Sequence, residues 1–268
     1  MLDMTTTPRR SNENSRPAAR RTSLGAEDRE SSANVTLDRI AGPDGRLSLL
    51  DDAGQVVQVA GAPVTESLRY MLARLRLGDH NEFPDRLGLT SAISGEGVTF
   101  ITRALALVLT TDVAKRVCIV DLNWWTPSDW PGRDVPGVAE VVRDGLPLEQ
   151  VLHLTGNPGL HVLPAGKTNL AERPALARCD ELAKMLDELN EEFEHVLLDL
   201  PAVHATSEAL TLAENCPSLA LVVGQNITPE SEVKSALEEV EGVPLLGVIL
   251  NRSYSKIPRF IRNRIPGA

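Results

Sequence analysis

Short, nearly continuous runs of Val, Ile and Leu alternate with amphipathic segments in the second two thirds of the chain. Runs of this kind are typical of parallel strands that are covered by helices on both faces of a sheet. The predicted strands are RLGLTSA, RVCIVDL, LHVLPAG, HVLLDLP, LALVVGQ and LLGVILN. The predicted helices cover residues 100–111, 135–154, 177–193, 207–215 and 230–240. The pattern therefore predicts an α/β fold with a mostly parallel sheet.

The pattern is different nearer the N-terminus. Residues 1–34 are rich in Ser, Thr, Arg, Asn and Pro, so we expect a disordered and locally basic tail. Residues 35–62 alternate apolar and polar positions around the turn sequence DDAG, which predicts a small β-hairpin appendage. Residues 66–77 have the leucine spacing of an amphipathic helix. We expect one α/β domain over residues 63–268, preceded by the hairpin and the tail.

Composition narrows the possible partners. The chain has 27 Lys and Arg against 37 Asp and Glu, a formal charge of −10, which argues against general affinity for nucleic acid or anionic lipid. No apolar stretch reaches the roughly 18 to 20 residues that a membrane span requires. The three cysteines are widely spaced and fit a reduced, cytoplasmic setting. Any membrane association is therefore expected to go through a partner.

A glycine-containing loop follows the first predicted strand of the domain. Residues 87–99 read LGLTSAISGEGVT, which has the form of a phosphate-binding loop between a strand and a helix. The full motif has a lysine after its last glycine and then a hydroxyl for Mg²⁺. Here Gly97 is followed by Val98 and Thr99, so the hydroxyl is present and the lysine is absent.

Polar residues also end other predicted strands. Asp121 and Asn123 follow the second strand, Asp199 the fourth, and Asn251 and Arg252 the last. Because ligands bind beyond the carboxyl ends of parallel strands, these residues are candidates for the same site as the glycine loop.

A dinucleotide-binding fingerprint is the competing interpretation of the loop. Gly95 and Gly97, with Asp121 about 24 residues later, imitate its first two glycines and its ribose-binding acid. Phe100 would replace the third glycine, where a large residue prevents close packing of helix and strand. That interpretation also leaves Asp199 unexplained. We therefore favour the interpretation of the loop as the phosphate-binding loop of a P-loop NTPase fold.

The motifs together resemble one family. Over roughly three quarters of the chain, the sequence is similar to the kinase domain of bacterial tyrosine autokinases of capsule and exopolysaccharide synthesis. These CpsD/CapB-type kinases belong to the ParA/MinD-like P-loop ATPases. TSAISGEGVT matches their loop T-S-x-x-P-G-E-G-K-[ST], VCIVDLNWWTP their motif hhhDxDxRxP, and VLLDLPA their motif hhhDxPP, where h is apolar. LHVLPAG and LLGVILNRS match two further family motifs.

The resemblance implies roles for individual residues. Asp121 and Asp199 would be the catalytic acids, with activity impaired, and Mg²⁺ would be held by Thr99, Asp121 and Asp199. ATP or ADP would be bound by Gly95, Glu96, Gly97, Val98, Thr99, Phe100, Asn251 and Arg252.

Three departures from the family pattern bear on activity. Val98 replaces the loop lysine, Asn123 replaces one acid, and Tyr254 stands alone where the family has a tyrosine cluster. Losing one preorganised charge of this type costs about 10² to 10³ in rate. We therefore predict a degenerate autokinase-like protein with weakened ATP and Mg²⁺ binding and weak or no turnover. It would act as a regulatory or scaffolding subunit in exopolysaccharide or capsule synthesis and export.

Two other functions stay open, so enzymatic activity is undecided. One is an active protein tyrosine kinase or ATPase in which Arg103, or a residue of a neighbouring subunit, replaces the lysine. The other is a ParA/MinD-like positioning ATPase that binds DNA or membrane, against which the acidic balance counts.

The resemblance also implies partners. A membrane polysaccharide co-polymerase or chain-length regulator, or a kinase homologue, would hold the chain at the inner face of the membrane. Self-association would use the family pattern E-x-x-R-x-x-R, which Glu66 and Arg69 fit and Leu72 does not. Three tryptophans in the loop after the second strand could cap the nucleotide, form a partner surface or simply pack: Trp124, Trp125 and Trp130.

Overall fold

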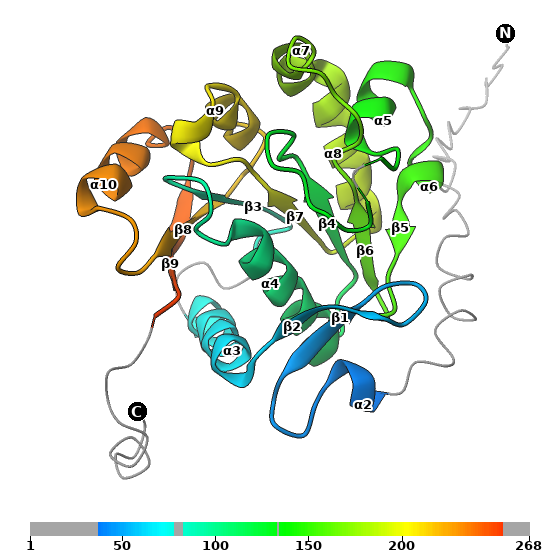
Figure 1. The fold of residues 1–268 in the computed structure, drawn as a ribbon, viewed down its shortest axis with the longest axis vertical. Helices are drawn as coiled ribbons and strands as arrows, with labels where there is room; N and C mark the ends of the chain where they lie inside the picture. The colour runs from blue at the N-terminus through cyan, green and yellow to red at the C-terminus, as the bar shows by residue number, and fades with distance from the viewer. Residues whose placement is uncertain (1–36, 78–82, 133, 254–268) are drawn as a thin grey trace, which may run out of the picture.

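A seven-stranded sheet forms the centre of the computed structural model, which describes residues 37–77, 83–132 and 134–253. The strand order is β5-β6-β4-β7-β3-β8-β9, and every neighbouring pair is parallel except β5 with β6 (Figure 1). The strands are β3 (Arg86–Ser91), β4 (Val117–Asp121), β5 (His153–Leu154), β6 (Leu160–Leu163), β7 (His195–Asp199), β8 (Leu219–Gly224) and β9 (Leu245–Asn251). All six predicted strands are present, and the predicted fold class is confirmed.

Helices cover both faces of this sheet. One face packs against α3 (Ala62–Leu77) and α4 (Val98–Asp112). The other face packs against α5 (Val138–Asp144), α7 (Arg173–Arg178), α8 (Asp180–Glu192), α9 (Glu208–Ala213) and α10 (Glu230–Glu239). The elements α2 (Leu37–Ile40), α6 (Leu148–Val151) and the 3₁₀ turn η2 (Val203–Ala205) are short.

The helix predicted over residues 135–154 is wrong as a single element. It is divided into α5, α6 and the two-residue edge strand β5. Gly145 ends α5 in the left-handed conformation, with φ of 67°, and Pro147 lies immediately before α6. A glycine and a proline this close together end one helix and start another, so the amphipathic spacing alone overestimated the helix length.

A hairpin precedes the large sheet and shares its core. Strands β1 (Leu47–Leu50) and β2 (Val56–Ala60) pair antiparallel. Leu47 and Leu49 are buried in the same apolar cluster as the residues of α4. Asn157, next to the sheet, accepts a hydrogen bond from the Leu50 amide (2.8 Å) and donates one to the Ser48 carbonyl (2.9 Å). The hairpin is thus packed into the domain rather than standing apart from it.

The described cysteines and helices add two observations. Cys118 is fully buried, as its apolar surroundings predict. Among the described residues, no helix combines the length and apolar character needed to span a bilayer. The tail predicted over residues 1–34 and the lone Tyr254 lie outside the described residues.

Candidate phosphate-binding site

The glycine loop joins the end of β3 to the start of α4, at the carboxyl edge of the sheet (Figure 1). Gly95 and Gly97 have φ angles of 86° and 94°, a region that disfavours residues with a Cβ. A Cβ on Gly97 would lie 2.3 Å from the Asn251 side-chain nitrogen, so a larger residue there would displace the Asn251 side chain from the loop. The two glycines therefore set both the backbone conformation and the close approach of β9.

The backbone of the loop offers donors to an anion. Gly97 precedes the first residue of α4, and no side chain caps this helix end. Within the described residues, the amides of Gly97, Val98 and Thr99 have no hydrogen-bond acceptor. Unpaired amides at the positive end of a 15-residue helix form a site for phosphate oxygens.

Glu96 supports the loop from inside the protein. Its side chain is fully buried and accepts hydrogen bonds from the amides of Gly224 (2.7 Å) and Ile93 (3.0 Å) and from the Thr228 hydroxyl. A buried carboxylate with several donors is held firmly in place. The Glu96 carboxylate thus joins the loop to the end of β8, and only the Glu96 backbone is left to face a ligand.

The end of β9 contacts the same loop from the outside. The Asn251 side-chain nitrogen donates to the Glu96 carbonyl at 2.7 Å, and the Arg252 guanidinium donates to the Gly95 carbonyl at 2.9 Å. Both residues predicted at the end of the last strand therefore lie at the phosphate loop, from which they are separated by 155 and 157 residues along the chain.

Asp121 and Asp199 lie opposite each other at the ends of β4 and β7. Both are buried. Burial, together with the charge of Asp121, raises the pKa of Asp199 to about 7, and burial raises the pKa of Asp121 to about 6. The Asp199 Oδ1 atom is buried and has no hydrogen-bond partner among the described residues. An unpaired buried carboxylate oxygen of this kind favours a cation next to it.

In the described part of the chain, Asp121 and Asn123, unlike the Asp199 Oδ1 atom, have hydrogen-bond partners in their own loop. The Asp121 carboxylate accepts hydrogen bonds from the Asn123 and Ser128 amides, both at 2.9 Å. The Asn123 side chain donates to the Thr126 hydroxyl at 2.8 Å and accepts from the Thr126 amide at 3.1 Å. Asn123 therefore closes a turn of its own loop.

These residues fit Mg²⁺ accompanied by a phosphate. Mg²⁺ prefers oxygen ligands and is often held by one or two carboxylates, substrate phosphates and waters. The Thr99 hydroxyl lies close enough to Asp199 to lower the pKa of that carboxyl, so a hydroxyl lies near an unpaired carboxylate oxygen. The described residues include no cluster of three His, Cys, Asp or Glu side chains suited to a metal. A metal here would therefore depend on the nucleotide for several of its ligands.

Two predicted ligand residues turn their side chains towards the core. Val98 is 9% exposed and belongs to the apolar cluster around α4. Phe100 packs against that cluster, and its carbonyl accepts a hydrogen bond from the Gln58 side chain at 3.0 Å. Only the backbone amides at these two positions are therefore available to a ligand.

Arg103, the candidate replacement for the missing lysine, is engaged elsewhere. Its guanidinium donates to the Ser128 hydroxyl and to the Trp130 carbonyl (3.3 Å), and it lies 5.8 Å from the centre of the Trp130 ring. Burial lowers the pKa of Arg103, whereas Asp199 and Asp121 act in the opposite direction. Arg103 thus braces the loop after β4 and contributes positive charge near the two acids.

The three tryptophans have separate environments. Trp124 is buried, and its indole donates to the Ala165 carbonyl at 2.8 Å. Trp125 is half-buried beneath the Arg173 guanidinium, which lies 5.3 Å from the ring centre, and Trp130 packs with Arg103. Trp124 is therefore a core residue, and the three do not form one aromatic surface.

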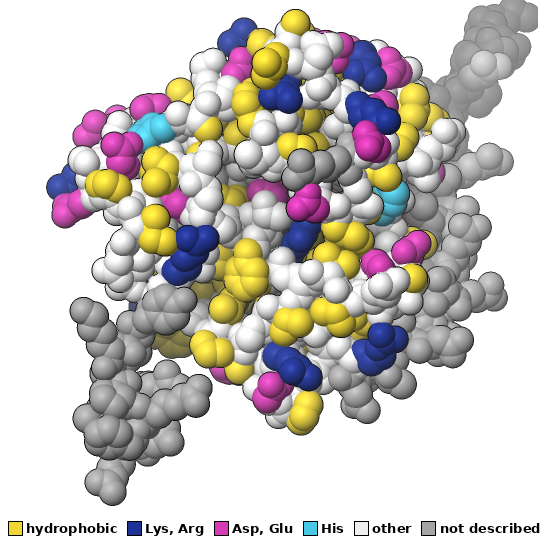
Figure 2. All heavy atoms as spheres, viewed as in Figure 1, with side chains coloured by type: hydrophobic (Ala, Val, Ile, Leu, Met, Phe, Trp, Pro, Cys, Tyr) yellow, Lys and Arg dark blue, Asp and Glu magenta, His cyan; other side chains and the backbone are white. Residues whose placement is uncertain are grey.

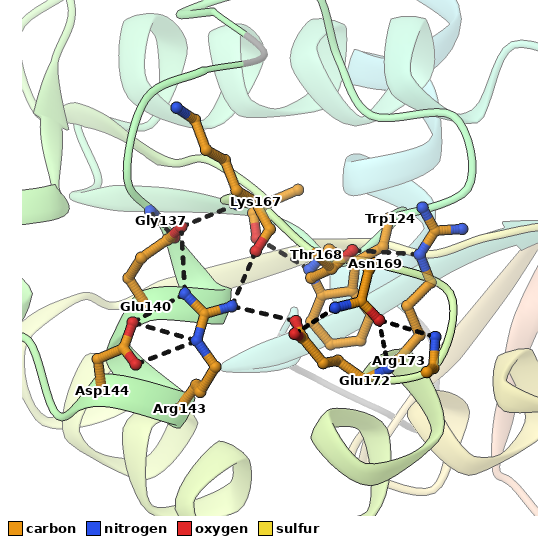
Figure 3. Close-up of polar contacts among 12 residues, drawn as sticks. Trp124, Gly137, Glu140, Arg143, Asp144, Lys167, Thr168, Asn169, Glu172 and Arg173 are labelled. Atoms are coloured by element: carbon orange, nitrogen blue, oxygen red, sulfur yellow. Dashed lines mark hydrogen bonds and ion pairs between the residues drawn. The ribbon is translucent and has the colours of Figure 1, made fainter.

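A charged network holds the loop after β6 beside the loop after β4 (Figure 3). Arg143 of α5 donates to the Lys167 carbonyl (3.0 Å) and to the Glu172 carboxylate (3.1 Å). The Glu140 carboxylate accepts hydrogen bonds from the amides of Gly137 (2.8 Å) and Lys167 (3.0 Å). Sequence reasoning missed this support, although the spacing of Glu140 and Arg143 on one helical face was a signal.

The site brings together most of the predicted residues. The backbone of the glycine loop, Thr99, Asp121, Asp199, Asn251 and Arg252 all lie at the carboxyl edge of the sheet. The family described as "Cellulose biosynthesis protein BcsQ" matches residues 85–238, which is more than half of the chain. The chain belongs to the BcsQ family.

The relatives of this BcsQ-family chain include tyrosine-protein kinases. It is 26% identical over 191 residues to tyrosine-protein kinase ptk of Acinetobacter johnsonii, a match that covers 69% of this chain and 26% of that protein. It is 25% identical over 181 residues to tyrosine-protein kinase CpsD of Streptococcus agalactiae, covering 65% of this chain and 78% of that protein. The chain thus spans about a quarter of the length of the first of these relatives.

Solved structures confirm the predicted P-loop ATPase fold. The kinase domain of Escherichia coli tyrosine kinase Etk matches with a TM-score of 0.64 and 20% identity, over 74% of this chain and 80% of that one. Cobyrinic acid a,c-diamide synthase of Mycobacterium smegmatis, solved with an ATP analogue and magnesium, matches with a TM-score of 0.52 and 20% identity. That match covers 69% of this chain and 80% of the synthase chain. The predicted relationship to CpsD-type kinases is confirmed, and the ParA/MinD-like part of the prediction is confirmed at the level of the fold.

Proposed function

We propose that this chain binds ATP or ADP with weak or no turnover and acts as a regulatory or scaffolding subunit of exopolysaccharide or capsule synthesis and export. One observation carries the proposal. The phosphate loop keeps its backbone conformation and its unpaired amides, while the side chain in place of the lysine, Val98, is buried in the apolar core. The site is thus built for a phosphate group but lacks the charge that drives phosphoryl transfer.

Different residues of this chain would bind the phosphate groups and the Mg²⁺ ion. The amides of Gly97, Val98 and Thr99 would bind phosphate oxygens, and the glycine conformations would keep these amides in place. Thr99 and Asp199 would hold Mg²⁺, and Asp121 would add negative charge beside them. When bound, Mg²⁺ neutralises charge on the phosphate oxygens.

Weak turnover follows from the missing charges. A lysine and a second acid are absent at the positions of Val98 and Asn123, and Asn123 is held by Thr126. Each loss of a preorganised charge is expected to lower the rate by about 10² to 10³. Binding suffers less, because backbone amides and the helix dipole supply much of the attraction for phosphate.

The proposed role in polysaccharide synthesis is supported by the BcsQ family match and by the resemblance to CpsD-type kinases. The partner would be a membrane polysaccharide co-polymerase, a chain-length regulator or a kinase homologue, and it would hold the chain at the inner face of the membrane. Self-association through α3 is less well supported. Arg69, the candidate contact, pairs within the chain with Asp112 (2.7 Å) and Glu66 (2.8 Å).

Titration calorimetry with ADP and ATP, with and without Mg²⁺, tests this proposal on the wild type and on Val98→Lys. We expect measurable binding by the wild type and affinity at least about ten-fold higher for the lysine variant, because a lysine side chain is long enough to extend its ammonium out of the apolar cluster to the phosphates. Thermal unfolding of both proteins would show that the lysine is tolerated. Wild-type calorimetry without any heat of binding would contradict nucleotide binding, and phosphorylated Tyr254 after incubation with ATP would contradict weak turnover.

A further inference from the structure

The phosphate loop lacks its lysine, and two arginines lie close enough to supply the missing positive charge. Arg103 extends from α4, one turn after Thr99, and Arg252 follows the last residue of β9. Their contacts distinguish them. Arg103 is half-buried, donates through Nη2 to both the Ser128 hydroxyl and the Trp130 carbonyl, and lies near the Trp130 ring, so its guanidinium is held against the loop after β4.

Arg252 is exposed and lies directly on the phosphate loop. Its guanidinium donates to the Gly95 carbonyl at 2.9 Å, and within the described residues its other guanidinium nitrogens have no acceptor. The contact therefore uses one donor and leaves a charged group with free N–H bonds at the rim of the site. An arginine can offer two parallel N–H donors to a phosphate, which a lysine cannot.

The backbone at Arg252 is held in a conformation that places the side chain there. Its φ is 58°, in the left-handed region that a long side chain rarely adopts. The Arg252 amide donates to the Asn251 side-chain oxygen at 2.8 Å, while the Asn251 side-chain nitrogen donates to the Glu96 carbonyl. One asparagine thus links the loop and the strained residue. Unfavourable backbone conformations of this kind are found preferentially at functional sites.

A second observation indicates that this is a ligand site and not only a helix end. Asp199 is 2% exposed, and its Oδ1 atom has no partner at the same edge of the sheet within the part of the chain that the structure describes. The unpaired amides of the loop fit a phosphate. The buried carboxylate without a partner fits a cation bound beside that phosphate.

We propose that Arg252 is the phosphate-directed cation of this site and takes over part of the role of the missing loop lysine. This inference rests on the proposed nucleotide binding and assigns its phosphate specificity to a residue at the sheet edge. Arg252 keeps the loop in shape through the Gly95 carbonyl and offers its free donors to the oxygens of a di- or triphosphate. Its positive charge also offsets the negative charge of the phosphates, which the apolar Val98 side chain cannot do.

Arg252→Gln tests the proposal, because glutamine keeps an N–H donor but has no charge. Arg74→Gln is the matched control: Arg74 is exposed on α3, and its substitution changes the net charge equally. Calorimetry would measure ADP directly and pyrophosphate by competition with ADP, each at two salt concentrations. We expect the Kd of both ligands to rise about ten-fold or more in Arg252→Gln, with a weaker salt dependence, and to stay unchanged in Arg74→Gln.

The double variant Val98→Lys with Arg252→Gln sharpens the test. If Arg252 substitutes for the lysine, its loss should matter less once a lysine introduced in place of Val98 supplies a charge, so the two effects should not be additive. Equal losses in both backgrounds would overturn the inference, and so would weaker ADP binding with unchanged pyrophosphate binding, which would place Arg252 at the base or sugar. Wild-type protein that binds neither ligand would overturn the proposed function itself, whereas binding that Arg252→Gln leaves unchanged would overturn this inference alone.

Discussion

At the scale of single residues, the site is defined by where its charges lie. Glu96 is in the phosphate loop, yet its carboxylate is turned inward to Gly224, Ile93 and Thr228. Arg252 is on a distant strand end, yet its guanidinium reaches the loop. The carboxylate of the loop is therefore buried and hydrogen-bonded, and the positive charge near the loop comes from outside the motif.

Glu96→Gln should lower both the stability of the protein and its affinity for ADP. The variant amide still accepts hydrogen bonds from Gly224 and Thr228, but its nitrogen would face the Ile93 amide, so one buried donor loses its acceptor. We expect a loss of about 1–3 kcal/mol in the free energy of unfolding, measured with urea. ADP affinity should fall in parallel. The exposed Glu191→Gln serves as control, and equal urea midpoints for the two variants would contradict the bracing role.

At the scale of elements, the hydrophobic pattern predicted most of the fold because the central strands of the sheet are buried on both faces. β4 and β7 have no exposed residue, so their sequences are continuous apolar runs. The exceptions are local. β5 has only two residues, and Gly145 and Pro147 interrupt a segment whose polarity still looked helical.

The candidate site could be predicted only where its residues end strands. Parallel topology places Asp121, Asp199 and Asn251 at one edge, and strand ends are readable from the sequence. Contacts between distant segments are not readable in this way, because they depend on side-chain direction. The bond from Arg252 to Gly95 and the inward turn of Glu96 are of this kind.

The hairpin offers a test of integration at the element scale. Asn157 is 2% exposed and satisfies the Leu50 amide and the Ser48 carbonyl of β1. Asn157→Ala leaves two buried backbone groups without partners, so we expect the free energy of unfolding to fall by about 2–4 kcal/mol in a single transition. Gln150→Ala removes an exposed amide as a control. Loss of the hairpin in a separate, earlier transition would instead show that it folds independently.

At the scale of the whole molecule, charge is spread widely. The formal charge is −10, and Figure 2 shows acidic and basic side chains interspersed on the viewed face, with no extended basic field among the residues described there. Affinity for nucleic acid is therefore not expected from this face. The buried charges are different, because Asp121 and Asp199 lie side by side in the sheet and their repulsion acts on the stability of the entire domain.

This buried pair should make the metal-free protein more stable as the pH falls from 8 towards 5. The pKa values of Asp199 and Asp121 are raised to about 7 and about 6 from an ordinary value of 3.8, so the folded state holds more protons than the unfolded state between about pH 4 and 7. The free energy of unfolding therefore rises as the folded carboxylates are protonated, and the stabilisation is lost as the pH increases through 7.

Asp199→Asn removes one charge of the pair permanently. In EDTA, we expect its midpoint of thermal unfolding to exceed that of the wild type by about 4 °C or more at pH 8, with the gap closing towards pH 4. Glu191→Gln, exposed on the surface, should show no such gap, and a gap for Asp199→Asn that is constant across the pH range would exclude titration of the pair as its cause.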